Sequence, residues 1–381
     1  MKNIKLIFVS ITLLFAASSC DSLLDVSTKH ALPQDKIKTV AGCESLIIGV
    51  YDQLQDSYYA GRDLICIPDV LGDNCQLSPG ATSYIGQYNF QPYYNIDIWE
   101  SAYKQIGALN EAIYYLSEME QTSKVKALVG EALFLRAYNY FNLSIVYSRV
   151  PGQLIDNFNL CVPLLTKPFF NEGGSITEQA SVPRSTVDAV WGQIVTDLTD
   201  SYALLNNNDS GNSPYRVSAA AVKALQSRVY LYKGDWTNTI LAANDAISKA
   251  SVTLQSGDYT KIFSEGSESI WQLHYAVTEN LKSLSLHSTY GTYDNGLRDE
   301  DGFGDGTGPG DAQLSISNDF IELIDQSNDT RFQTIRKVHY YGQDLWWTTK
   351  FNSWGGVFGL DDVPLIRISE VYLSRAEAYA H

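Results

Sequence analysis

The chain has 381 residues, and its 43 Asp and Glu against 27 Lys and Arg give a formal net charge of −16. Such an acidic chain repels nucleic acid and anionic lipid, so a nucleic-acid partner is not expected. The 25 Tyr and 7 Trp together outnumber the Lys and Arg. Because their rings combine an apolar face with a hydrogen-bonding tip, they suit a binding surface.

The first twenty residues have the order of a bacterial lipoprotein leader. Lys2 and Lys5 precede a short apolar run, and small residues lead directly into Cys20. This order predicts a signal peptide at 1–19 and acylation of Cys20. Several acyl chains give stable anchoring, because each buried methylene contributes about 0.8 kcal/mol. We therefore expect a water-soluble body on a lipid tether; an ordinary signal peptide followed by a chance cysteine is the alternative.

Four more cysteines follow in the expected mature chain, and their spacing matches no zinc pattern. An oxidising compartment permits a disulfide without requiring one. Buried free thiols are the favoured interpretation for these residues, which are Cys43, Cys66, Cys75 and Cys161.

Helical periodicity dominates from residue 39 to residue 250. It predicts a very apolar helix that ends before Pro151, and a tight helical pair around Gly234-Asp235. Asp97 is the expected cap of the second helix, and Trp99 is expected in its core face. Ser185 or Thr186 is expected to cap the fourth. The six predicted helices span 39–55, 97–118, 125–147, 185–205, 218–233 and 236–250.

The last helical pair has the spacing of small and aromatic residues found in tetratricopeptide-type hairpins. The residues that carry this spacing are Ala224, Tyr230, Gly234, Asp235, Trp236, Ala243 and Ala246. The predicted fold class is therefore mostly α: tetratricopeptide-like helical hairpins form a scaffold with large irregular loop insertions at 56–96, 152–184 and 251–365.

Segments along the whole chain resemble the SusD/RagB-like outer-membrane lipoproteins of Bacteroidota. The most specific is Gly130-Glu-Ala-Leu-Phe-Leu-Arg-Ala-Tyr-Asn-Tyr-Phe141, which continues to Val150-Pro151. The others, in chain order, begin at Cys20, Trp99, Pro183, Tyr230 and Pro364. The family pattern continues beyond the last of them, so we expect a C-terminal truncation that leaves an apolar face open near Leu373.

The resemblance implies a binding protein that is not an enzyme. It implies a cell-surface lipoprotein of the outer membrane that captures oligosaccharides and hands them to a SusC-like TonB-dependent transporter. It also implies one SusD-like domain over 20–381, with a repeat scaffold at 39–250, a loop-rich ligand-binding part at 251–365 and the start of a further repeat at 366–381. A peptide-capturing member of the family and a surface glycoside hydrolase are the alternatives.

Sugar recognition needs rings for the apolar face of the sugar and polar side chains for its hydroxyl rim. Two loop segments combine these residue types, and they hold the predicted ligand-binding residues Asp73, Asn74, Tyr84, Tyr88, Tyr93, Tyr94, Tyr290, Tyr293, Asn295, Arg298, Trp346 and Trp347. Anchoring of the loop to the scaffold is the alternative for each ring. Trp271, near the apolar residues Ile270 and Leu273, is also typical of a buried strand.

No cofactor is expected. Clustered carboxylates between Asp294 and Asp311 make calcium a minor possibility, although Phe303 breaks the EF-hand spacing. A glycosidase would need two opposed carboxylates, and nothing in the sequence singles out such a pair. The histidines His274, His287 and His339 are scattered and are expected to be ordinary loop or strand residues.

Overall fold

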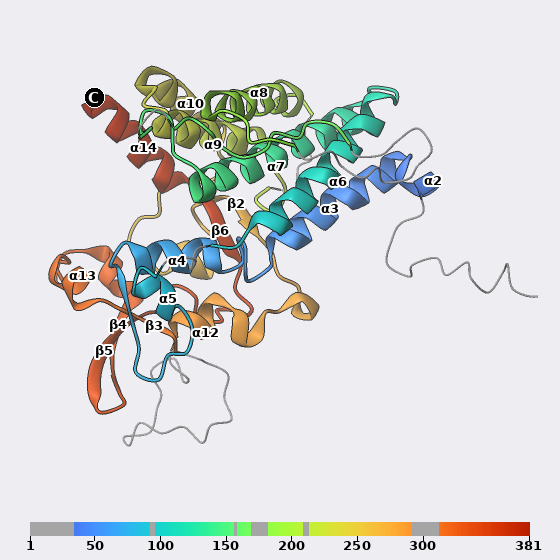
Figure 1. The fold of residues 1–381 in the computed structure, drawn as a ribbon. Helices are drawn as coiled ribbons and strands as arrows, with labels where there is room; N and C mark the ends of the chain where they lie inside the picture. The colour runs from blue at the N-terminus through green and yellow to red at the C-terminus, as the bar shows by residue number, and fades with distance from the viewer. Residues whose placement is uncertain (1–33, 92–95, 156–157, 169–181, 209–212, 292–311) are drawn as a thin grey trace, which may run out of the picture.

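The structure is a computed structural model that describes residues 34–91, 96–155, 158–168, 182–208, 213–291 and 312–381 (Figure 1). Long helices gather in one region of the molecule, and short helices with β-strands form the other. After the short α2 (Gln34–Ile37), the long helices are α3 (Val40–Leu54), α6 (Trp99–Ser117), α7 (Ser123–Tyr147), α8 (Val187–Leu205), α9 (Ala219–Tyr232), α10 (Trp236–Lys249) and α14 (Ile368–Ala380).

The long helices pack as a succession of neighbours. α6 lies between α3 and α7, α8 lies between α7 and α9, and α14 packs on α9 and α10. α7 is buried on nearly all of its faces because it has neighbours on several sides. The predicted mostly-α fold is confirmed. Among the helices that the structure describes, none is long and apolar enough to cross a membrane.

Side-chain caps explain why the predicted helix starts agree so closely with the observed ones. In five of the long helices the cap oxygen accepts a hydrogen bond from the backbone N–H three residues later, which satisfies one donor that the helix leaves unpaired. The predicted start at residue 125 is two residues late, because Thr122 is the cap. The five caps are Thr39, Thr122, Thr186, Ser218 and Asp235.

The start of α6 corrects two predictions. Asp97 does not cap it; the N-cap residue is Ile98, without a side-chain bond. Instead, the Tyr147 hydroxyl of α7 accepts from the backbone N–H of Ile98 at 3.1 Å and of Trp99 at 3.2 Å. Trp99 is 39% exposed and lies edge-on against Tyr147, whereas Ile98 is fully buried. Ile98, one position earlier, therefore takes the core place predicted for Trp99.

The α9–α10 pair has the predicted hairpin geometry. Gly234 adopts φ +68°, a left-handed conformation that favours glycine, and reverses the chain between the helices. Ala224 of α9 and Ala243 and Ala246 of α10 are buried at 3% exposure or less. Their small side chains let the two helices approach closely. On α14, by contrast, Leu373 is 70% exposed, as the sequence predicts for this apolar residue.

The segments predicted as irregular loop insertions also contain short helices and strands, which the sequence analysis did not place. The first holds α4 (Asp63–Leu71), β1 (Cys75–Leu77) and α5 (Ile85–Tyr88). The third holds α11 (Lys261–Ser264), β2 (Ser269–Leu273), η1 (Val277–Glu279), η2 (Lys282–Leu284), α12 (Leu286–Tyr290), β3 (Leu314–Ile316), α13 (Asn318–Glu322), η3 (Thr330–Thr334), β4 (Ile335–Tyr340), β5 (Gln343–Thr348) and β6 (Val363–Arg367). These elements are too short to give a clear hydrophobic period.

The strands form two antiparallel sheets. One has the order β1-β3-β5-β4, so β1 of the first loop segment pairs with β3, more than 230 residues later. The other pairs β2 with β6, next to the long helices. Trp271 of β2 is fully buried, and its ring meets Phe134 and Tyr138 of α7 edge-on at 4.9 and 5.0 Å. The prediction that Trp271 is a buried strand residue is therefore confirmed.

The four described cysteines are all free and buried, as predicted. Burial, together with the nearby charge of Glu111, raises the pKa of the Cys43 thiol to about 11. Burial likewise raises the pKa of Cys66 and Cys75. These thiols therefore behave as small core side chains and are not activated nucleophiles.

Candidate functional site

A cavity of about 380 Å³ lies where the first loop segment meets the third. Its volume falls within the range of about 300–1,000 Å³ that is typical of small-molecule sites. Four rings and several polar groups share its lining. The lining residues are Ile65, Asp69, Asn74, Cys75, Phe263, Tyr290, Ile316, Phe320, Ile324, Arg331, Thr334, Ile335, Thr348, Lys350, Phe351, Pro364 and Arg367.

The alternation of side chains along β5 gives the cavity one wall. Thr348 and Lys350 line the cavity, and Trp346, two residues earlier, lies on the same side of the strand. Trp346 pairs with Ile316 of β3, which also lines the cavity. The side chain of Trp347 points the opposite way and is 2% exposed. Trp346 therefore lies on the cavity side of β5 but beyond the lining, with its ring 5.7 Å from that of Phe332 and 5.6 Å from the Lys337 ammonium, whereas Trp347 belongs to the core of the sheet.

Asp69 on α4 organises the polar side of the cavity. One carboxylate oxygen accepts a 2.7 Å hydrogen bond from the Tyr290 hydroxyl, and the other accepts a 3.4 Å bond from the Asn74 side chain. Burial raises the pKa of Tyr290 well above its ordinary value, so its hydroxyl stays protonated and donates. Two of the residues predicted from sequence, Asn74 and Tyr290, are thus brought together around Asp69.

The remaining predicted residues that the structure describes lie outside the lining. Tyr84 is 8% exposed, and its hydroxyl donates to Asp63 at 3.0 Å, so it fixes the loop. Tyr88 is 40% exposed on α5. The backbone carbonyl of Asp73 accepts a 2.6 Å bond from Ser317, which joins the turn after α4 to α13.

Six residues predicted from the sequence lie outside the described residues: Cys20, Tyr93, Tyr94, Tyr293, Asn295 and Arg298. The acidic segment from Asp294 to Asp311, considered for calcium, also lies outside them. In the part of the chain that is described, no cluster of three or more His, Cys, Asp or Glu side chains is arranged to hold a metal ion.

The sequence prediction missed the residues that give the cavity its rings and its positive charge. Phe263 and Phe320 are half-buried in short helices, and Lys350 follows β5. Phe carries no polar tip, and the prediction favoured Tyr and Trp for that reason. The only available signal was the alternation of Trp346, Thr348 and Lys350, which becomes informative once β5 is known to be a strand.

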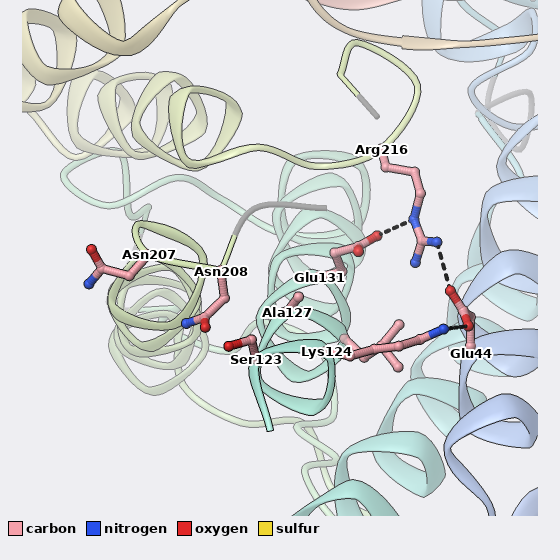
Figure 2. Close-up of a pocket in the computed structure, with 9 residues that line it drawn as sticks. Glu44, Ser123, Lys124, Ala127, Glu131, Asn207, Asn208 and Arg216 are labelled. Carbon is pink, nitrogen blue, oxygen red and sulfur yellow. Dashed lines mark hydrogen bonds and ion pairs between the residues drawn. The ribbon is translucent and has the colours of Figure 1, made fainter. Parts of the chain in front are cut away.

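A second cavity, of about 460 Å³, lies among the long helices and has a different character. Figure 2 shows Arg216 between Glu131 of α7 and Glu44 of α3, with Lys124 reaching Glu44. Burial raises the pKa of Glu131, whose carboxylate also accepts a 2.8 Å bond from Tyr51. None of its described lining residues is aromatic. This network ties the chain before α9 to α3 and α7 and offers no ring to a sugar.

One group of side chains superficially resembles a hydrolase triad. His287 hydrogen-bonds the Ser353 hydroxyl, and Asp361 lies nearby. The two Asp361 oxygens, however, accept from the backbone N–H groups of Ser353 and Trp354 at 2.9 and 3.0 Å. His287 is only 4% exposed. The Ser353 hydroxyl also accepts a 2.8 Å bond from the backbone N–H of Gly359, so the hydrogen bonds of the group close a loop between residues 353 and 361.

Comparison with known proteins decides the family. The model of a SusD-like family, described as starch-binding and associating with the outer membrane, matches residues 22–231, more than half of the chain. The chain belongs to the SusD-like family. Proteins of this family are binding proteins of the cell surface or outer membrane and are generally not catalytic.

Curated SusD-like relatives are distant in sequence. SusD-like protein P38 of Formosa agariphila is 24% identical over 299 residues, which are 73% of this chain and 55% of that protein. SusD-like protein P2 of the same organism is 24% identical over 62% of this chain and 44% of that protein. The chain therefore spans about half the length of the curated relatives it matches.

Solved structures share the fold of this SusD-like chain. A SusD superfamily protein from Bacteroides thetaiotaomicron has a TM-score of 0.75 at 22% identity, over 90% of this chain and 76% of that one. A laminarin-binding SusD-like protein has a TM-score of 0.67 at 21% identity, over 89% of this chain and 80% of that one. At these identities the likeness establishes the fold.

Proposed function

We propose that this SusD-like chain captures oligosaccharides in the cavity beside β5 and delivers them to a SusC-like TonB-dependent transporter. Acylated Cys20 holds the protein at the outer surface of the outer membrane. The observation that supports capture is the lining itself, in which half-buried rings lie beside oriented amide, hydroxyl and carboxylate groups. A sugar presents an apolar face and a polar rim, and this lining complements both.

Phe320 of α13 is the ring that we assign to stacking. It is half-buried, and no ring contact to it is recorded among the described residues, whereas Phe263 already lies against two cations. Phe351 is 7% exposed and Tyr290 is 4% exposed, so their faces are mostly covered. Trp346, on the cavity side of β5 beyond the lining, supplies a second ring for a longer chain of sugars.

The lining gives little support to a glycoside hydrolase. Asp69 is the single carboxylate among the described residues that line the cavity, and its oxygens already accept bonds from Tyr290 and Asn74. Glycoside hydrolysis ordinarily needs two carboxyl groups, about 5–9.5 Å apart, on either side of the bond to be cleaved. Capture without cleavage is the function that this lining suits.

Calorimetric titration with a panel of oligosaccharides tests the proposal. We expect binding to at least one oligosaccharide, and a loss of about tenfold or more in affinity for Phe320→Ala, because a stacked ring at a binding centre contributes about 1.4 kcal/mol or more. Phe90→Ala is the matched control, since Phe90 is 64% exposed and lies outside the lining. Binding of peptides alone would identify the peptide-capturing alternative, and release of shortened sugars would identify a hydrolase.

A further inference from the structure

Lys350 stands out among the charged residues of the cavity because no carboxylate of the described residues lies within ion-pair distance of its ammonium, and Asp69 acts on it only from farther away. Its ammonium lies 5.5 Å from the centre of the Phe263 ring, and no hydrogen bond or ion pair to it occurs within the described residues. Lys350 is half-buried, and an ammonium ion that is partly removed from water without a paired anion is costly. Burial and the neighbouring Arg367 charge lower the pKa of Lys350, and the negative charge of Asp69 only partly offsets them.

Each of the two arginines of the cavity is paired with a carboxylate, but part of each guanidinium forms no hydrogen bond among the described residues. Arg331, at the rim, pairs with Asp329 through Nε and Nη2, which leaves Nη1 unbonded among the described residues. Arg367 lies 3.7 Å from Glu268, beyond hydrogen-bond range, and its Nη1 is buried without a hydrogen-bond partner. Arg367 also lies 5.4 Å from the centre of the Phe263 ring that Lys350 contacts.

Asp69 acts on Lys350 through its charge but does not hydrogen-bond any of the three cations. Its two oxygens accept from neutral donors, as described above, and three cations share the cavity with this single lining carboxylate. Asp329, Glu268 and Asp69 balance the three cations in number, but they leave Lys350 Nζ, Arg331 Nη1 and Arg367 Nη1 without a hydrogen bond among the described residues. A ligand oxygen that bonds a charged donor without a partner contributes strongly to the binding free energy, because that hydrogen bond is charge-assisted and shielded from water.

We propose that the oligosaccharide captured in this cavity carries carboxylate or sulfate groups, and that one such group is the counter-ion of Lys350. The inference rests on the proposed function and specifies its substrate class. Arg367 and Arg331 flank the same anion, because a planar guanidinium offers paired donors to the oxygens of carboxylate and sulfate. A neutral sugar would leave the ammonium of Lys350 without an anion within ion-pair distance.

Calorimetric titration with three matched tetrasaccharides tests the inference: neutral galactose, galacturonate and 6-sulfated galactose. We expect at least one charged tetrasaccharide to bind about tenfold or more tightly than the neutral one, with an affinity that falls as salt rises. Lys350→Met keeps the length of the side chain and removes its charge. It should abolish most of that preference and leave the affinity for the neutral tetrasaccharide within about twofold.

Lys104→Met is the matched control, since Lys104 lies on α6 and pairs with Glu100 away from the cavity; it should leave all three affinities unchanged. A second measurement is independent of binding: Lys350→Met should unfold at an equal or higher urea concentration, because it removes an unpaired charge.

The outcomes separate the two proposals. Equal affinity for charged and neutral tetrasaccharides, or an unchanged preference in Lys350→Met, overturns the anionic inference and leaves glycan capture standing. Absence of binding to a wide panel of neutral and charged glycans overturns both. A preference for galacturonate over sulfated galactose, or the reverse, supports the inference and identifies the anion.

Discussion

The buried ion pair between Arg136 of α7 and Asp197 of α8 offers a sharp test of how the helical scaffold is held together. The two side chains form a bidentate pair, with Nε–Oδ2 and Nη2–Oδ1 distances of 2.8 and 2.7 Å. They are 6% and 1% exposed. Arg136 also donates to Asn110 of α6 at 2.8 Å, so one guanidinium joins three successive helices.

The expected effect of Asp197→Asn follows from this burial. The substitution keeps the shape of the side chain but leaves the Arg136 charge without an anion in a site closed to water. Removing one partner of a buried pair typically costs about 3–5 kcal/mol, because the remaining charge is uncompensated. Since a whole domain has a free energy of unfolding of about 5–15 kcal/mol, the variant should lose a large fraction of its stability.

Urea unfolding followed by circular dichroism measures this loss as a lower transition midpoint. Glu100→Gln is the matched control, because Glu100 and Lys104 form an exposed pair, with side chains 81% and 68% exposed, and its midpoint should stay unchanged. The double variant Arg136→Met with Asp197→Leu removes both charges. It should be more stable than Asp197→Asn, because apolar side chains of similar volume leave no unpaired charge.

The reasoning is refuted if Asp197→Asn unfolds at the same urea concentration as the unmodified chain. It is also refuted if the double variant is less stable than the sum of its two single substitutions predicts. Either result would mean that the pair has no net coupling across the α7–α8 interface, and that the apolar contacts alone hold these helices.

Three further predictions concern packing, pH and thiol chemistry. Gly130→Ala should lower the free energy of unfolding by about 1–3 kcal/mol, since the added Cβ would lie 2.7 Å from Leu205 Cγ. The Cβ added by Gly107→Ala meets nothing within 4 Å, so this variant should raise the free energy of unfolding by about 0.5–1 kcal/mol. Urea titration checks both. Because the pKa of Glu131 is raised, its carboxyl group binds a proton more readily in the native state than in the unfolded state. The contribution of Glu131 to stability should therefore fall as pH rises from 4.5 through the native pKa. Glu131→Gln should remove that slope from a plot of urea midpoint against pH. The pKa of Cys43 is raised to about 11, and all described thiols are buried. A chromogenic disulfide reagent at pH 8 should therefore label these thiols slowly in the folded chain and at once in the urea-unfolded chain. Rapid labelling of these thiols in the folded chain would contradict their burial.

The amino-acid sequence by itself determined the helical scaffold. Thr39, Thr186, Ser218 and Asp235 stand where helices begin, and the apolar period between caps continues for several turns. These are local signals, because a cap bonds a backbone N–H three residues away. The predicted cap that failed, Asp97, failed where the partner is distant: the Tyr147 hydroxyl reaches the start of α6 from the end of α7.

Only the tertiary structure decided which residues form the cavity. Asp69, Tyr290 and Lys350 are separated by up to 281 positions in the sequence, and pairing of β1 with β3 and of β3 with β5 brings them together. Trp346 and Trp347 are adjacent and chemically identical, yet one lies on the cavity side of β5 and the other is core, because successive side chains of a strand point to opposite faces. A composition rich in aromatic residues indicated a binding surface, but strand register, which depends on long-range pairing, determined which rings face it.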